Sequence, residues 1–379
     1  MRPVRVVPVG DPLHVLAELR LALSATDEAL LPVPAGETGT DRESLGPVPR
    51  RVAVVIETSG STAAPKRVML STDALLASAA ASSVALGGDG QWLLALPAHY
   101  IAGVQVLVRS IAAGTEPVLL PPGHFDPAEF AAYAGWLVEP LRFTSLVPVQ
   151  LARLLDAAET DPAMLAVLRR FTGILVGGQA VAPALIERAE RLRIRVLRTY
   201  GSSETAGGCV YDGVPIGNTV VRAVDGQLEI SGSVLADGYL DDEERTRERF
   251  VDDQGVRWYR TGDLGAVGAD GTVSVTGRAD NVIISGGEKV SLDAVEALVR
   301  TLPGLGDALV VRANDPVWGQ AGVVVLAADQ APALEPVRAA VAAELGRAAR
   351  PARIVTVGTV PLLASGKPDR QAVERLVGR

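Results

Sequence analysis

The sequence is poor in the residue types that build disulfides and zinc sites. It has one cysteine, Cys209, and three histidines in 379 residues. One cysteine cannot form an intramolecular disulfide, and the scattered histidines give no spacing typical of a zinc site. These shortages exclude a disulfide-stabilised scaffold and a zinc centre built from cysteine and histidine.

Long apolar runs and an excess of positive charge are also missing. The longest apolar stretches, such as 92–97, are far shorter than the ~20 residues that a membrane-spanning helix needs. No secretion signal is recognisable at the N-terminus. Because 36 basic residues face 44 acidic ones, the formal net charge is -8. We expect a cytoplasmic protein without a membrane span that does not bind nucleic acid.

Lysine is the scarcest charged residue. Only Lys66, Lys289 and Lys367 are lysines, and the other 33 basic residues are arginines. Lysine is a slim point charge, whereas arginine is a planar fork. The three lysines are therefore candidates for positions at which arginine cannot serve.

The chain up to about residue 212 alternates short apolar strands with helical segments. We expect strands at 51–57, 92–96, 117–120, 143–147, 173–176 and 194–199, and helices at 72–86, 103–113, 127–135, 148–157 and 183–192. This alternation is typical of an α/β domain with a mainly parallel sheet, and 51–57 is expected to be a buried parallel strand. The segment 32–49, rich in Gly, Pro, Thr and Glu, is interpreted as a linker.

From about residue 213 the pattern changes to short strands punctuated by glycines, which predicts a β-rich subdomain. Beyond about residue 281 we expect helices at 291–300 and 334–346 and strands at 308–313, 321–327 and 353–357. The predicted fold class is α/β, with a large N-terminal domain over 1–279 and a small, mobile α+β C-terminal domain over 280–379.

Residues 58–66 (TSGSTAAPK) follow a predicted strand and combine hydroxyl groups, a glycine and a lysine. Such a loop can surround phosphates with hydroxyl and backbone N–H groups while Lys66 supplies charge. The spacing is not that of a Walker A loop. The alternative interpretation is a flexible turn with a solvated lysine.

Further chemistry-bearing motifs lie downstream. The stretch 200–205 (YGSSET) follows a predicted sheet strand, and its Tyr200 could stack on a base. Glu204 could bind Mg²⁺, and the alternative is that Glu204 is an exposed loop acid. Asp263, just before a predicted turn, is a candidate for binding ribose hydroxyls. The glycine-bearing stretch 277–289 lies at a predicted hinge. Lys367, in the turn 365–368 (SGKP), is catalytic or a solvated tail lysine.

Taken in order, these motifs resemble the adenylate-forming acyl-CoA synthetase superfamily, over residues 52–370. Within it, 97–100 (PAHY), 145–148 (SLVP), 207–213 (GGCVYDG) and 284–288 (ISGGE) resemble the o-succinylbenzoate–CoA ligases of menaquinone biosynthesis, particularly their short actinobacterial form. The 57 residues before the phosphate loop are fewer than in most members. The first 50 residues are therefore not covered by the resemblance.

The resemblance implies a role for each motif residue, with ATP and CoA as co-substrates, Mg²⁺ as the metal and a small-molecule acid as the partner. A homodimer is left open. The implied phosphate and adenine contacts are Thr58, Ser59, Gly60, Ser61, Thr62, Lys66, Gly178, Gln179, Tyr200 and Ser203. The ribose contacts are Asp263 and Arg278, and Glu204 holds the metal. The substrate contacts include Gly201 and Ser202. Lys367 is the adenylation lysine, Asp280 is the hinge, and Gly286 and Gly287 lie on the CoA side.

The acid implied by the resemblance has a second carboxylate that is not activated. A buried carboxylate needs a cation or strong donors, and Arg109 is our candidate. The alternative is an arginine on the solvent face of a helix. His99 resembles the family's gate beside the acyl pocket, although a packed histidine at a helix start is the other interpretation.

Three functions remain open at this point. The first is a ligase that adenylates o-succinylbenzoate and transfers it to CoA. The second is another aryl- or acyl-CoA ligase, or an enzyme that loads a carrier protein. The third is a nucleotide-binding protein without turnover, which the retention of Lys66 and Lys367 among 33 arginines argues against.

Overall fold

The computed structural model describes residues 1–24, 28–36, 45–58, 65–362 and 368–378. The chain divides into two compact units. Unit 1 consists of 1–222, 229–261 and 267–273, and unit 2 of 223–228, 262–266 and 274–379. Each unit is described by itself.

The first sheet of unit 1 is mixed. Its strand order is β1-β2-β3-β4-β14, with β1, β2 and β3 parallel and the last two pairings antiparallel. The strands are β1 (Val4–Pro8), β2 (Ala29–Val33), β3 (Val52–Thr58), β4 (Lys66–Ser71) and β14 (Gly238–Tyr239). Every residue of β2 is buried, as expected of a strand between two others under a helical layer.

The second sheet of unit 1 has seven strands in the order β11-β10-β9-β8-β7-β5-β6. The five from β9 to β6 are parallel, and β10 and β11 continue the sheet in antiparallel pairings. The strands are β5 (Gln91–Leu94), β6 (Val118–Leu119), β7 (Arg142–Leu146), β8 (Gly173–Val176), β9 (Val196–Ser202), β10 (Gly207–Tyr211) and β11 (Val214–Pro215).

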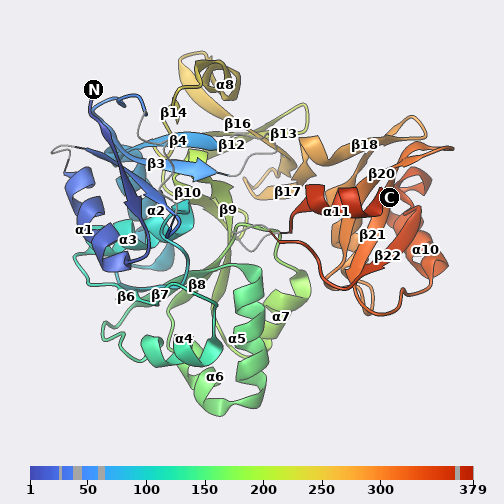
Figure 1. The fold of residues 1–379 in the computed structure, drawn as a ribbon, viewed down its shortest axis with the longest axis horizontal. Coiled ribbons are helices and arrows are strands. Elements are labelled where there is room, and N and C mark those ends of the chain that lie inside the picture. Colours follow the sequence, from blue (N-terminus) through green and yellow to red (C-terminus); the bar gives the residue numbers. More distant parts are fainter. Residues whose placement is uncertain (25–27, 37–44, 59–64, 363–367, 379) are drawn as a thin grey trace. The chain divides into compact units, whose positions relative to one another are not determined.

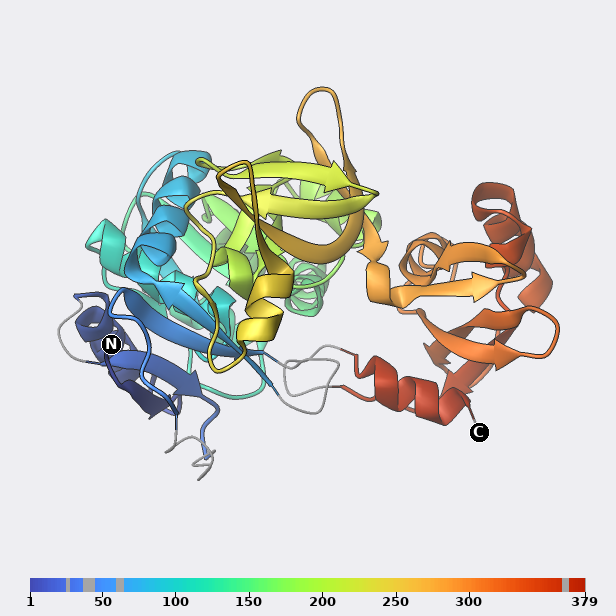
Figure 2. The ribbon, with the colours of Figure 1, turned by 90° about the horizontal axis from the view of Figure 1, so that it is seen from above.

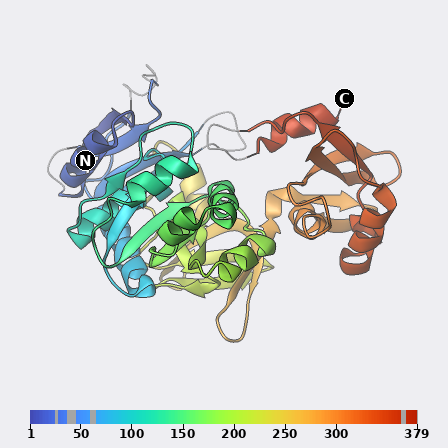
Figure 3. The same cartoon turned by 90° about the horizontal axis from the view of Figure 1, so that it is seen from below.

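Helices pack around both sheets of unit 1 (Figure 1). They are α1 (Pro12–Leu23), α2 (Thr72–Leu86), α3 (Ile101–Ala113), α4 (Pro127–Ala134), α5 (Pro148–Thr160), α6 (Pro162–Leu168), α7 (Pro183–Arg191) and α8 (Glu243–Arg249). α2 contacts β4 of the first sheet and β10 of the second, so it lies between them. The green helices α4 to α7 lie together beside the second sheet (Figure 3). None of the helices in the described ranges has the length and apolar character of a membrane span.

A third sheet has the order β12-β13-β16-β15, with β17 also paired to β16. Its strands are β12 (Val220–Val224), β13 (Gln227–Ser231), β15 (Phe250–Asp253), β16 (Val256–Val267) and β17 (Val273–Arg278). Short 3-10 helices are η2 (Ser203–Thr205), η3 (Ala279–Asn281) and η4 (Arg347–Ala349). These strands form the predicted β-rich part of the chain.

The C-terminal part of unit 2 is a sheet covered by helices on both faces (Figure 2). Its order is β19-β18-β21-β20, with β22 paired to β21. The elements are β18 (Val282–Ser285), β19 (Glu288–Ser291), β20 (Leu309–Asp315), β21 (Gly319–Ala327), β22 (Arg353–Val357), α9 (Leu292–Val299), α10 (Leu334–Leu345) and α11 (Arg370–Val377). α9 and α10 share one apolar cluster with the sheet, and α11 shares the other.

The α/β class is confirmed, and so is a buried strand at 51–57 that pairs in parallel with β2, but the position predicted for Asp263 is wrong. The strand predicted at 51–57 is not in a purely parallel sheet, because β3 pairs with β4 in antiparallel orientation. The first two residues of the predicted linker 32–49 belong to β2, where Pro32 is paired with Val7. Residues 37–44 lie outside the described residues, so the linker stays a prediction. Asp263 lies within β16 rather than before a turn.

Candidate active site

The predicted phosphate loop closes an antiparallel hairpin between β3 and β4. Thr58, the last residue of β3, is the cross-strand partner of Lys66, the first residue of β4. Ser59, Gly60, Ser61 and Thr62 lie outside the described residues. This pairing places Lys66 at the start of β4 in the first sheet.

Lys66 faces a buried carboxylate from the other sheet. Its Nζ atom lies 3.8 Å from Oε1 of Glu204, and the two side chains are 31% and 5% exposed. Glu204 belongs to η2, which follows β9, and its carbonyl accepts a hydrogen bond from Ala236 N at 2.8 Å. The alternative of an exposed loop acid is therefore wrong for Glu204.

The sequence interpretation missed a third member of this cluster, Tyr239 of β14. Its hydroxyl donates a hydrogen bond to Glu204 Oε1 at 2.8 Å. Burial and the neighbouring Glu204 charge raise the pKa of Tyr239, so the phenol remains a proton donor. The pairing of β14 with β4 places Tyr239 opposite Val68, two residues from Lys66. Only this pairing between distant segments reveals the role of Tyr239.

The stretch 200–205 runs from β9 into η2. Ser202 N donates to Thr205 Oγ1 at 2.9 Å, and that hydroxyl donates to the Gly207 carbonyl at 2.8 Å. Gly201 is the cross-strand partner of Gly208 in β10. Tyr200 is half-buried, and Ser203 is buried. These bonds give the motif a fixed backbone path beside Glu204.

Gly178 and Gln179 follow the strand adjacent to β9. β8 and β9 are parallel, with Val176 paired to Arg198, so 178–179 leave the sheet at the edge toward which β9 carries Tyr200. Gly178 has a positive φ of 78°, a conformation that favours glycine. The carboxyl edge of a parallel sheet is the usual ligand side of such folds.

Arg109 is buried in α3, with 6% exposure, which rules out the solvent-face alternative. Its guanidinium lies 4.9 Å from the centroid of the Trp92 ring, and its Nε atom has no hydrogen-bond partner in the part of the chain that the structure describes. Burial lowers the pKa of Arg109, and Tyr211 partly opposes that shift. A buried cation stacked on an aromatic ring but with an unsatisfied donor is suited to receiving an anion.

The face of helix α3 that carries Arg109 also contacts the segment that follows the 200–205 motif. Ile101 and Gln105 precede Arg109 by two turns and one turn. A Cβ added to Gly207 would lie 3.3 Å from Gln105 Cγ and 3.9 Å from Ile101 Cγ1. Gln105 is buried, and its Oε1 has no hydrogen-bond partner, so it is a second polar group that the sequence interpretation missed. His99 is half-buried just before this helix, with its ring 4.0 Å from that of Tyr100.

Unit 2 contains the remaining described candidates. Arg278 Nη1 lies 2.8 Å from Asp263 Oδ1, and Arg278 also contacts Asp280 at 3.3 Å. Burial opposes the charge of Arg278, but Asp280 and Asp263 outweigh it and raise the pKa of Arg278. Burial likewise works to raise the pKa of Asp280, but the Arg278 hydrogen bond and charge lower it overall. The two predicted ribose contacts and the predicted hinge residue thus form one charged cluster.

Two other candidates of unit 2 are Gly286 and Gly287. They connect β18 to β19 and both have positive φ, at 58° and 87°. We call this pair the diglycine turn. Lys367 lies outside the described residues.

The described residues include no group of three or more His, Cys, Asp or Glu side chains able to hold a metal. A metal here would need oxygens from another source, and Mg²⁺ commonly takes one or two carboxylates together with substrate phosphates. The buried Glu204 carboxylate beside Lys66 fits that requirement.

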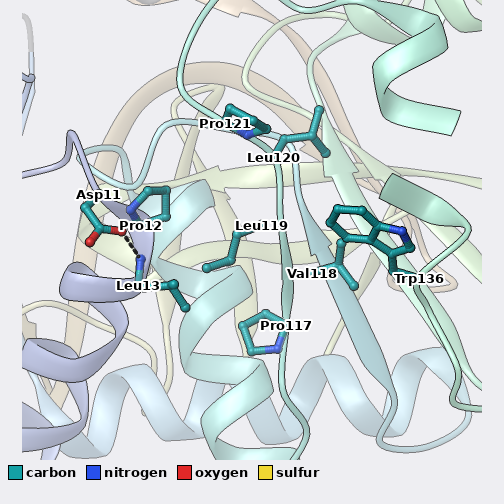
Figure 4. A pocket seen from close by; sticks show the side chains of 9 residues that line it. All are labelled: Asp11, Pro12, Leu13, Pro117, Val118, Leu119, Leu120, Pro121 and Trp136. Atoms are coloured by element: carbon teal, nitrogen blue, oxygen red, sulfur yellow. Dashed lines mark hydrogen bonds between the residues drawn. The ribbon is translucent and has the colours of Figure 1, made fainter. Parts of the chain in front are cut away.

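A separate cavity of about 340 Å³ lies on the surface of unit 1 (Figure 4). Pro12, Leu119, Pro121 and Trp136 are among its apolar lining residues, and its Asp11 carboxylate caps α1 by accepting from Leu13 N at 3.0 Å. None of the nine lining residues belongs to the predicted site.

Comparisons with known proteins give two family matches. A family model described as AMP-binding enzyme matches residues 6–240, and one described as AMP-binding enzyme C-terminal domain matches 294–367. The first match begins well before residue 52, so the resemblance extends further than the motifs suggested.

Two relatives and two solved structures illustrate the similarity. The chain is 40% identical to a "Probable 2-succinylbenzoate--CoA ligase" of Mycobacterium tuberculosis (strain ATCC 25618 / H37Rv), over 97% of each chain. It is 29% identical to the 2-succinylbenzoate–CoA ligase of Listeria monocytogenes (serotype 4b, strain F2365), over 86% of this chain and 70% of that one.

The two structures share the fold at low sequence identity. The o-succinylbenzoate CoA synthetase of Bacillus subtilis, in complex with its acyl-adenylate intermediate, superposes with a TM-score of 0.79 at 20% identity, over 98% of this chain and 88% of that one. ATP-bound MatB of Rhodopseudomonas palustris gives a TM-score of 0.83 at 19% identity, over 99% and 89%. With more than half of the sequence matched by the family model and a relative at 40% identity over 97% of both chains, this chain belongs to the AMP-binding enzyme family.

Proposed function

We propose that this chain is an AMP-forming 2-succinylbenzoate–CoA ligase. The observation that carries the nucleotide chemistry is the cluster of Lys66, Glu204 and Tyr239, a cation and a buried carboxylate beside the predicted phosphate loop. For the acid, the support is the buried guanidinium of Arg109, whose Nε atom is unsatisfied among the described residues, and the names of the relatives matched along most of their length.

In the first half-reaction a carboxylate oxygen attacks the α-phosphorus of ATP, and the bond from that phosphorus to the pyrophosphate oxygen breaks. The difficulty is to bring anions together while charge builds on the phosphate. We propose that Lys66 and the hydroxyl groups of Thr58, Ser59, Ser61 and Thr62, with Gly60, bind the β- and γ-phosphates. Lys367 bridges the attacking carboxylate and the α-phosphate. Bound Mg²⁺, which Glu204 would hold, supplies further charge neutralisation.

The rest of the nucleotide is held by the other candidates. Gly178, Gln179 and Tyr200 flank the adenine, and Ser203 contacts the α-phosphate. Asp263 and Arg278 bind the ribose. On the acyl side, Gly201 and Ser202 line the reacting end, His99 is the gate, and Arg109 binds the distal carboxylate.

In the second half-reaction the CoA thiol attacks the acyl carbon and AMP leaves. We propose that the chain functions as two domains, 1–279 and 280–379, which rotate about Asp280. This motion withdraws Lys367 and brings in Gly286 and Gly287, so that one site serves two reactions. We propose a cytoplasmic enzyme, where ATP and CoA are supplied. A homodimer stays a prediction.

Pyrophosphate release tests the proposal directly. With ATP, Mg²⁺ and purified protein, we expect release with o-succinylbenzoate to be at least about 100-fold faster than with benzoate or a fatty acid, because only the first acid can pair a second carboxylate with Arg109. CoA should then convert the adenylate to a thioester.

Each alternative has its own result in the same assay. Release with other acids only would contradict the proposed substrate and favour another acyl-CoA ligase. Transfer to a carrier protein but not to CoA would favour a loading enzyme. No release with any acid would contradict an enzymatic role.

The Glu204–Tyr239 hydrogen bond leads to a second prediction. Tyr239→Phe keeps the ring but removes the donor that orients the carboxylate. We expect the Mg²⁺ concentration for half-maximal pyrophosphate release to rise about 10-fold, as is usual when a partner of a metal ligand is lost. Tyr133→Phe, on α4, is the matched control and should leave it unchanged. An unchanged Mg²⁺ requirement in Tyr239→Phe would show that the hydroxyl does not orient Glu204.

A further inference from the structure

The diglycine turn is in direct contact with a second turn of unit 2. This second turn, 315–319, connects β20 to β21 (Figure 1). β18 and β21 are neighbours in the sheet, and Ser285 is paired with Gly319. The two turns therefore leave the sheet side by side.

Trp318 makes the contact between them. Its carbonyl accepts a hydrogen bond from Gly286 N at 2.8 Å. A Cβ added to Gly286 would lie 2.5 Å from Cε3 and 2.6 Å from Cζ3 of the Trp318 ring. The indole thus covers the Cα of Gly286 at a distance that leaves no room for any side chain at that position.

Trp318 is itself fixed from its own turn. One oxygen of Asp315 accepts hydrogen bonds from both Val317 N and Trp318 N at 2.8 Å, and these bonds lower the pKa of Asp315. A further bond joins the two strands beside these turns, from Ile284 N in β18 to Gln320 Oε1 in β21 at 3.1 Å. The 315–319 turn is therefore a stiff platform, and the indole is its contact with the diglycine turn.

The diglycine turn needs such a platform. Two consecutive glycines with positive φ suit a tight hairpin turn, but glycine has more conformational freedom than any other residue. The Trp318 ring supplies this support, because it packs on Gly286 in the turn that we have proposed for the CoA side.

We infer that Trp318 is a positioning residue that holds the diglycine turn in the conformation used for thioester formation. This inference rests on the proposed role of Gly286 and Gly287 in the second half-reaction. It predicts that loss of the indole affects one half-reaction and spares the other.

The test measures the two half-reactions separately in Trp318→Ala. We expect thioester formation from supplied acyl-adenylate to fall at least about 10-fold, with pyrophosphate release in the absence of CoA within about twofold of wild type. Intact adenylation shows that the variant is folded. Val317→Ala, in the same turn and 82% exposed in the native side chain, should change neither rate. Trp318→Phe, which keeps a ring, should recover most of the thioester rate.

A double variant separates positioning from a direct contact with CoA. The methyl group that Gly286→Ala introduces collides with the indole, so this substitution should slow thioester formation much less in the Trp318→Ala background than in wild type. If the effects of the two substitutions on the thioester rate simply multiply, the inference is overturned. It is also overturned if Trp318→Ala leaves both rates unchanged. If wild-type protein adenylates acids but never forms a thioester, the proposed function fails instead.

Discussion

Lys367→Ala is expected to lower the rate of pyrophosphate release from ATP and o-succinylbenzoate by about 10²–10³-fold, the usual loss when one group that stabilises transition-state charge is removed. The attacking carboxylate and the α-phosphate are both anions, and a cation between them reduces their repulsion while negative charge grows on the phosphate. Thioester formation from supplied acyl-adenylate should change little, because the phosphate bond has already been made. Single-turnover pyrophosphate release and thioester yield measure the two steps.

The chain contains a matched control for this variant. Lys289 is exposed on β19, opposite Ile284, and has no ion pair among the described residues. Lys289→Ala should therefore leave both rates near wild type. Lys367→Arg keeps the charge but replaces a point charge with a wide fork, and we expect it to recover little activity. Loss of both half-reactions in Lys367→Ala would mean that the lysine is structural.

Sequence periodicity predicted several helices and strands well because their signals are local. α2 begins at Thr72 as expected, since Ser71 Oγ accepts a hydrogen bond from Ala74 N, and it ends before Gly87, which has a left-handed conformation. The strands β8 and β22 match their predicted bounds. Such caps and short apolar runs can be recognised from a few neighbouring residues.

The missed residues depend on contacts between distant parts of the chain. Tyr239 follows a glycine that was interpreted only as a break between short strands. Its role depends on the pairing of β14 with β4, which lies about 170 residues earlier in the chain. Trp318 is important because its ring packs on Gly286, and Gln105 because its side chain lies against Gly207. Nothing in the local sequence distinguishes these side chains from ordinary core residues. For Glu204 and Arg109, by contrast, the residue was predicted and the structure decided between two environments.

Arg109→Ala should raise the KM for o-succinylbenzoate about 100-fold and leave the KM for ATP within about twofold, since a charge-assisted hydrogen bond to a carboxylate contributes about 1.5–3 kcal/mol. The guanidinium is buried, and its Nε is unsatisfied among the described residues. Arg109 lies on the face of α3 that contacts Gly207. Initial rates over a matrix of both substrate concentrations separate the two constants. Arg153→Ala, at an exposed arginine of α5, is the control and should change neither.

Stability distinguishes a substrate-binding arginine from a structural one. A structural Arg109 would have hydrogen-bond partners whose loss is costly. A buried charge that stacks on Trp92 and whose Nε is unsatisfied among the described residues instead destabilises the free protein. Arg109→Met, which retains an apolar stem, should therefore unfold in urea with a free energy equal to or above that of wild type while still losing affinity for o-succinylbenzoate. The cost of keeping an unsatisfied cation in the free enzyme is then recovered only when the distal carboxylate binds. A variant that loses stability and raises both Michaelis constants together would remove Arg109 from the acyl site and leave Trp92 packing as its role.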